Sequence, residues 1–282
     1  MMKNYNNQML RISDKSGFAI PAFNYSDLWE FDAIIRAAKA ERSNVYVASN
    51  MRVVGSHGIG ILGALGAKAH ELSGGHVINH LDHSNSIELC KLAVDAGYHS
   101  VMIDASMYSL EENIERVVEV VSYAHNNGVL VEAEIGRILG KSNEGNYQGE
   151  DYLVSVADAV KLAERTGVDS LAVGIGTAHG FYKEEPKINI QRLREVNDAV
   201  SIPLVLHGGT GVPPETIRSC IKNGIAKVNV GTLLHATYIN ELRKQLVSYQ
   251  GTSISDLMEP VREAIVPKVQ EWIRVCGSQN SY

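Results

Sequence analysis

Three histidines in this 282-residue chain stand where short apolar segments end, and their positions suit a metal site. His83, His179 and His207 each lie beside small residues that leave space around the ring. Three neutral imidazoles bind Zn²⁺ well and leave a fourth coordination position for water or substrate. A single histidine of this kind is more often a packed, hydrogen-bonded side chain. Three at corresponding positions favour a metal site, provided that the segments are strands of one closed barrel.

Carboxylates accompany these histidines. Asp82 directly precedes His83, and a carboxylate beside a divalent metal can act as a general acid/base or as a further ligand. Glu132 and Glu134 are two residues apart, so in a strand they share one face. Two inward carboxylates are costly to bury without a cation. The alternatives are a metal-related role for Glu134 and a buried ion pair with Lys227 or Arg137.

Glycine-rich turns near the C-terminal third suggest a phosphate site. Gly208, Gly209 and Thr210 follow one apolar segment, and Thr232 follows the next. Backbone N–H groups and hydroxyls at such turns can converge on an anion. Ordinary tight-turn chemistry is the plainer alternative.

A metal, an acid/base carboxylate and a phosphate cradle together suit the cleavage of a ketose phosphate through an enediolate. A metal-dependent sugar-phosphate isomerase or epimerase passes through the same kind of intermediate and stays open on these residues alone. A non-catalytic protein that binds sugar phosphate is a third alternative, which three retained metal ligands disfavour.

The elements that must position these residues alternate regularly along the chain. Eight strand-like apolar runs are expected at 18–23, 45–48, 77–81, 100–103, 129–134, 170–173, 203–206 and 227–230. Helical patterns lie between them, for example at 28–42, 86–96 and 111–126. Eight βα units predict an α/β fold, a TIM (β/α)8 barrel formed by residues 1–282 as a single domain. Active sites of such barrels lie at the C-terminal ends of the strands, where the residues above fall.

Two segments fall outside the alternation. Residues 136–151 are polar and rich in glycine, and a loop of this length after the fifth strand is expected to be an active-site lid, with a disordered surface insertion as the alternative. The pattern of residues 254–275 predicts a final helix that covers the barrel or contacts a partner subunit.

Composition excludes several classes of protein. The chain has 26 basic and 32 acidic residues, a net charge of −6, which disfavours nucleic acid and anionic membrane surfaces as partners. Three widely spaced cysteines argue against a disulfide framework. The first ten residues lack the apolar core of a signal peptide, and no apolar run approaches ~20 residues. We therefore expect a cytoplasmic protein.

Several motifs, in order, resemble those of the class II fructose- and tagatose-bisphosphate aldolases over roughly residues 8 to 278. They are AFN at 22–24, HLDH at 80–83, MIDAS at 102–106, VEAEIGR at 131–137, GVDSLAVGIGTAHGFY at 167–182, PLVLHGGTG at 203–211, KVNVGT at 227–232 and VCGS at 275–278. HLDH and GTAHG look more like the shorter, tagatose-type branch.

The resemblance implies roles for individual residues. It implies that one catalytic Zn²⁺ is held by the three histidines, that Asp82 is the catalytic acid/base, and that Glu134 and Asp104 serve alternative metal positions. The implied substrate-binding residues are Asn24, Ser49, Arg52, Gly180, Gly208, Gly209, Thr210, Asn229, Val230, Gly231 and Thr232. It also implies a sugar-phosphate substrate, a monovalent cation near the phosphate, and a homodimer or homotetramer.

The sequence departs from the family's pattern at three places, which concern the side of the site that binds the acceptor aldehyde. Ser142 stands where the family's lid has a glutamate, and Glu144 could replace that glutamate. The chain ends Gln-Asn-Ser-Tyr without the arginine that can reach the acceptor phosphate. Arg52 resembles relatives from inositol breakdown, whose aldehyde is a carboxylated semialdehyde, although it could equally be a surface side chain. We expect release of dihydroxyacetone phosphate from tagatose or fructose 1,6-bisphosphate by default, with that other aldehyde as the alternative.

Overall fold

Eight parallel strands close into a barrel in sequence order, with each strand paired to its neighbours and β1 paired to β8. The strands are β1 (Ile20–Asn24), β2 (Val45–Asn50), β3 (Val77–Ser84), β4 (Ser100–Ile103), β5 (Leu130–Ile135), β6 (Ser170–Val173), β7 (Leu204–Leu206) and β8 (Ile225–Val230). This computed structural model describes residues 2–138, 153–182, 184 and 186–282. The predicted TIM barrel is confirmed.

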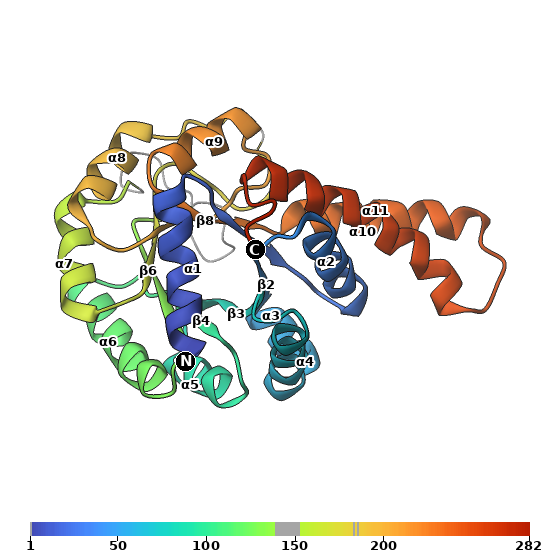
Figure 1. The fold of residues 1–282 in the computed structure, drawn as a ribbon, viewed down its shortest axis with the longest axis horizontal. Helices are drawn as coiled ribbons and strands as arrows, with labels where there is room; N and C mark the ends of the chain where they lie inside the picture. The colour runs from blue at the N-terminus through green and yellow to red at the C-terminus, as the bar shows by residue number, and fades with distance from the viewer. Residues whose placement is uncertain (1, 139–152, 183, 185) are drawn as a thin grey trace.

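Helices surround the barrel (Figure 1). They are α1 (Met2–Ser16), α2 (Leu28–Glu41), α3 (Met51–His57), α4 (Ile59–Leu72), α5 (Ile87–Asp95), α6 (Leu110–Asn126), α7 (Val156–Thr166), α8 (Ile190–Ala199), α9 (Pro214–Lys222), α10 (Thr232–Ser248) and α11 (Ile254–Val275). The last two form a hairpin that projects away from the barrel (Figure 1). None of the helices in the described part of the chain is long and apolar enough to cross a membrane.

The outward faces of the strands and the inward faces of the helices form one large apolar core. Alternation along each strand then directs the other side chains into the barrel. Glu132 and Lys227 are buried there and form an ion pair of 2.8 Å. Of the alternatives for the inward glutamates, the buried ion pair is therefore the one observed for Glu132, with Lys227 as its partner.

Helix α1 lies across one end of the barrel (Figure 1). Its Met9 and Leu10 pack on Ile20 and Ala226, which lie near the N-terminal ends of β1 and β8. The Ser13 hydroxyl donates to the Ala226 carbonyl at 3.2 Å. With this end covered, the C-terminal ends of the strands are left for a site.

Most expected boundaries agree with the structure to within a few residues, and the expected helix at 254–275 is α11. The clearest difference is β3, which was expected to end at residue 81 and continues to Ser84. The expected lid at 136–151 lies, apart from residues 136–138, outside the described residues, and so do Ser142 and Glu144.

Candidate active site

A pocket of about 270 Å³ opens at the C-terminal ends of the strands. Its lining residues are Asn24, Asn50, Asp82, His83, His179, Gly180, Gly208, Thr210, Asn229, Gly231, Thr232 and His235. Ten of these were predicted site residues; Asn50 and His235 were not. Segments far apart in the sequence thus meet at one rim of the barrel.

An irregularity in β3 turns two adjacent side chains toward the pocket. In a regular strand, Asp82 and His83 would face opposite sides of the sheet. The register with β4 shifts between Leu81 and Ser84, and His83 has a φ of 49°, in the left-handed region. Such backbone strain in a non-glycine residue is concentrated at functional sites. The bulge lets both the carboxylate and the imidazole line one pocket.

The three predicted metal ligands come together. Each of His83, His179 and His207 offers a ring nitrogen, and these atoms all lie within 4.8 Å of one another. His83 Nε2 is 2.7 Å from His207 Nδ1. The ring centroids of His83 and His179 are 4.9 Å apart. Three strands, β3, β6 and β7, therefore lead to one group of imidazoles.

Hydrogen bonds to carboxylates select which nitrogens face inward. Glu132 Oε1 is 2.7 Å from His207 Nε2, which places the proton on Nε2 and the lone pair on Nδ1. Asp104 Oδ2 is 3.1 Å from His83 Nδ1, which likewise leaves Nε2 as the lone-pair nitrogen. The two neighbouring nitrogens are thus both electron-pair donors, an arrangement that a bound cation stabilises.

The ionisation states also fit a cation site. Burial, with the nearby charge of His83, lowers the pKa of His207 to about 4, so the ring is neutral, as a metal ligand must be. Burial alone would raise the pKa of Glu132, but the Lys227 ammonium and the His207 hydrogen bond hold it well below its usual range. Glu132 therefore stays ionised and can keep His207 in its ligating tautomer.

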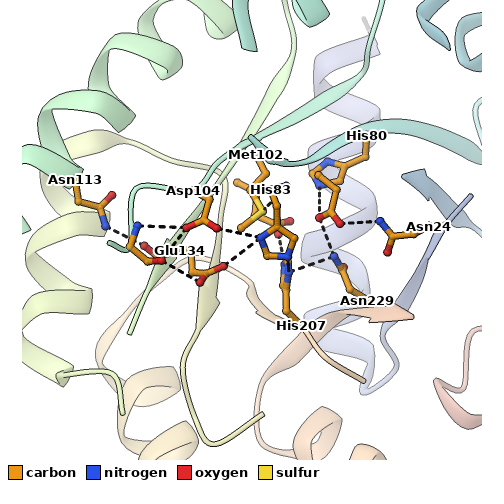
Figure 2. A network of polar contacts seen from close by, with 12 residues as sticks. Asn24, His80, His83, Met102, Asp104, Asn113, Glu134, His207 and Asn229 are labelled. Carbon is orange, nitrogen blue, oxygen red and sulfur yellow. Dashed lines mark hydrogen bonds and ion pairs between the residues drawn. The ribbon is translucent and has the colours of Figure 1, made fainter. Parts of the chain in front are cut away.

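A second group shares His83. Asp104, Glu134 and His83 also offer ligand atoms within 4.8 Å of one another. Glu134 Oε2 lies 3.6 Å from His83 Nδ1 (Figure 2). The Ser106 hydroxyl is 2.8 Å from Asp104 Oδ1 and 3.1 Å from Glu134 Oε1. The predicted alternative metal residues thus lie directly beside the histidine triplet.

Asp82 is held between two amides. Asn24 Nδ2 donates to its Oδ2 at 2.8 Å, and Asn229 Nδ2 donates to its Oδ1 at 3.0 Å. Burial favours the neutral acid, but the neighbouring imidazoles of His83 and His207 in particular hold the pKa of Asp82 far below its usual range. An ionised, oriented carboxylate in the pocket is equipped to accept a proton.

The glycine-rich turns also line the pocket. Gly208 has a φ of 69°, and a Cβ there would meet the Ala178 carbonyl oxygen at 2.3 Å. The Tyr182 hydroxyl accepts from the Ala178 N–H at 2.7 Å and donates to the Gly208 carbonyl at 2.9 Å. Helix α10 begins at Thr232, and its N-cap residue, Gly231, has no side chain to accept from the first turn. The start of a helix at a pocket is suited to an anion.

The sequence matches the family described as "Fructose-bisphosphate aldolase class-II" over residues 4–281. The chain belongs to the class II fructose-bisphosphate aldolase family. It is therefore a carbon–carbon lyase of a family that is generally metal-dependent, as the resemblance implied. The family assignment favours the aldolase over the isomerase, epimerase and non-catalytic alternatives.

Solved structures agree with this assignment. The YdjI aldolase from Escherichia coli K12 is 29% identical, with a TM-score of 0.86 over 98% of this chain and 97% of that one. A protein from Coccidioides immitis assigned as a fructose-1,6-bisphosphate aldolase is 30% identical, with a TM-score of 0.88 over 97% and 96%. The fructose-bisphosphate aldolase of Campylobacter jejuni, at 21% identity, shares the fold, with a TM-score of 0.84 over 100% and 97%.

Four of the expected substrate-binding residues do not line the pocket. The Ser49 hydroxyl is buried against Tyr98 Oη at 2.7 Å, and Val230 belongs to the core outside the barrel. Arg52 is exposed in the first turn of α3 and does not line the pocket. The Gly209 N–H donates to the Asn229 carbonyl at 3.1 Å, so it is engaged within the protein rather than directed at an anion.

Two pocket residues of the aldolase were missed. Asn50 ends β2, and its side chain accepts from two N–H groups in the first turn of α3. Its position beside Ser49 at a strand end was the signal that could have identified it. His235 lies inside α10, one turn past the strand end, where no strand-end pattern points.

Proposed function

We propose that this class II aldolase is zinc-dependent and reversibly cleaves tagatose or fructose 1,6-bisphosphate to dihydroxyacetone phosphate and glyceraldehyde 3-phosphate. The observation that carries the proposal is the convergence of three imidazoles beside an ionised aspartate in one pocket. The family assignment supplies the reaction class, and the donor set supports the metal. Zinc prefers nitrogen donors in this number and keeps a position open for substrate.

His83, His179 and His207 are the residues that would hold the ion. When bound, Zn²⁺ would act as a Lewis acid toward the carbonyl of the ketose phosphate. Asp104 fixes the orientation of the His83 ring and Glu132 that of His207. Glu134 and Asp104 provide the second position that the resemblance implies.

Asp82 is the proposed acid/base. In the cleavage direction it accepts the proton of the hydroxyl that becomes the aldehyde, and in condensation it returns that proton. The two amides of Asn24 and Asn229 direct both carboxylate oxygens without neutralising them. Because the carboxylate is ionised and buried, it can receive a proton from bound substrate with little competition from solvent.

The donor phosphate is proposed to bind at the glycine-rich side of the pocket. Gly180, Gly208 and Gly231 keep the backbone accessible, and Thr210 and Thr232 add hydroxyls. The start of α10 adds the positive end of a helix dipole. We also retain a monovalent cation near this phosphate as part of the proposal.

The default acceptor receives more support than the carboxylated semialdehyde. The residue that suggested the latter, Arg52, is exposed and does not line the pocket. Glyceraldehyde 3-phosphate is therefore the first aldehyde to test.

We further propose a cytoplasmic homodimer or homotetramer. The projecting hairpin exposes several large apolar side chains, of which Val247 is 84% and Ile254 72% exposed. Exposed apolar surface of this kind is typical of protein contacts. The three cysteines are free and buried, as suits a reducing compartment.

The test is release of dihydroxyacetone phosphate, followed with a coupled reductase, from fructose and tagatose 1,6-bisphosphates and from a 6-phospho-keto-deoxy acid of the inositol pathway. Each is assayed with and without chelator. Chelator-sensitive release from either bisphosphate is expected. Faster release from the keto-deoxy acid would overturn the default acceptor, and release that resists chelator would overturn the metal.

A further inference from the structure

Glu30 is a buried carboxylate that the mechanism above does not use. It lies in the first turn of α2 and is 1% exposed. Its Oε2 accepts the Ser26 N–H at 2.7 Å, and its Oε1 lies 2.8 Å from His235 Nδ1. Burying a carboxylate is costly unless it is paired. The pairing joins α2 to α10 at the edge of the pocket.

His235 is the pocket-facing member of this pair. Its side chain is 36% exposed, and it lines the same pocket as Asp82 and the histidine triplet. Because a carboxylate accepts at Nδ1, that nitrogen carries a proton, and Nε2 is the polar atom that the ring can offer to the pocket. Glu30 therefore fixes both the orientation and the hydrogen-bonding state of the imidazole.

The position of His235 in α10 directs it to one part of the substrate. It follows Thr232 by three residues, so the two side chains lie on one face of the helix. Side chains in helices lean toward the N-terminus, which brings the ring toward the first turn of α10. The Thr210 hydroxyl oxygen accepts the Leu233 N–H at 3.4 Å in this same turn. The imidazole thus lines the same pocket as Gly208 and Thr210.

We propose that His235, held by Glu30, is a further binding residue for the phosphate of the donor half of the substrate. This inference rests on the proposed function for the identity of the donor as dihydroxyacetone phosphate. Because Glu30 engages Nδ1, Nε2 is the ring atom left to hydrogen-bond a phosphate oxygen in the pocket. The pair acts in binding and takes no part in proton transfer at the reacting carbons.

If the pair only joined α2 to α10, its loss would lower thermal stability without changing the affinity for phosphate. His57 provides the matched control for this structural role. Its Nε2 lies 2.8 Å from the Ser26 carbonyl oxygen, so it also anchors the β1–α2 loop, but it is exposed and does not line the pocket. Substituting His57 disturbs the same loop without removing a group from the site.

The experiment compares His235→Ala, Glu30→Gln and His57→Ala with the unaltered zinc-loaded protein in the condensation direction. Hydrogen bonds to charged groups predict a ~10- to 100-fold rise in KM for dihydroxyacetone phosphate in His235→Ala. A smaller rise is expected in Glu30→Gln. In both variants kcat and the KM for the aldehyde should stay within about threefold, and His57→Ala should match the unaltered protein.

Binding of glycerol 3-phosphate, measured by calorimetry, is the second readout and needs no turnover. Weaker binding in His235→Ala supports the inference even if the unaltered protein proves inactive as an aldolase. Failure of the inference can therefore be distinguished from failure of the proposed function. Unchanged binding of glycerol 3-phosphate overturns the inference. A rise in the KM for the aldehyde alone, or a loss of thermal stability without a change in affinity, overturns it as well.

Discussion

The hydrogen bond from His207 to Glu132 should control zinc affinity, and Glu132→Gln tests this. The carboxylate uses one oxygen for His207 and the other for Lys227, at 2.7 and 2.8 Å. A glutamine has a single carbonyl oxygen and can satisfy only one of these two donors. The variant therefore loses either the tautomer control of His207 or the partner of a fully buried ammonium.

The magnitudes follow from these two losses. Removing a carboxylate that orients a metal-ligating histidine typically costs 10–100-fold in metal affinity, or ~1.4 to 2.7 kcal/mol. Leaving Lys227 buried without its counter-charge costs about 3–5 kcal/mol of folding free energy. Lys227 is 0% exposed, so solvent cannot compensate for the lost partner.

The assay is competition with a chelator of known zinc affinity, alongside thermal unfolding. The double variant Glu132→Gln/Lys227→Met is the control. Without the ammonium, the amide oxygen is available to His207 and most of the lost stability should return. Zinc affinity should stay below that of the unaltered protein, because a neutral amide supports the imidazole less than a carboxylate does. A folded Glu132→Gln protein that binds zinc within threefold of the unaltered chain would refute the tautomer control.

Three further outcomes are expected. Asp82→Asn should lower kcat by ~10²- to 10⁴-fold while zinc binding, measured by metal analysis, is retained; an active variant would remove Asp82 from proton transfer. Gly208→Ala should lose about 1–3 kcal/mol of stability and bind phosphate more weakly, because the added Cβ would lie 2.3 Å from the Ala178 carbonyl oxygen and the backbone φ is 69°. A thermal unfolding curve that matches the unaltered protein would contradict this strain. Arg52→Ala should leave kcat/KM for the bisphosphates within about twofold because the side chain lies outside the pocket, and a large loss in steady-state assays would restore its acceptor role.

Much of the fold was predictable because the chain repeats one physical pattern eight times. Each apolar run is the length of a buried strand, and each is followed by an amphipathic helix. Closure into a barrel then places the ends of all strands at one rim, which is why widely separated histidines could be assigned to one site. The ion pair of Glu132 with Lys227 followed from the cost of burying an inward carboxylate.

The site predictions that failed depend on local backbone geometry or on contacts between elements, which the sequence pattern does not show. The bulge that turns His83 into the pocket leaves no mark in the sequence of β3, where simple alternation would direct it away from Asp82. Ser49, by contrast, obeys the alternation of β2 and faces Tyr98 outside the barrel, so the strand pattern itself argues against its predicted role in substrate binding. His235 reaches the pocket only because α10 starts at the rim and Glu30 fixes its ring.

The most direct test of the central claim is a zinc titration of metal-free protein in which bound zinc and release of dihydroxyacetone phosphate are measured together. We expect activity to rise in proportion to bound zinc and to saturate at one ion per chain, and His83→Ala to lose both. Full activity in the metal-free protein, or zinc binding and turnover that survive in His83→Ala, would contradict the assignment of the histidine triplet as the catalytic metal site.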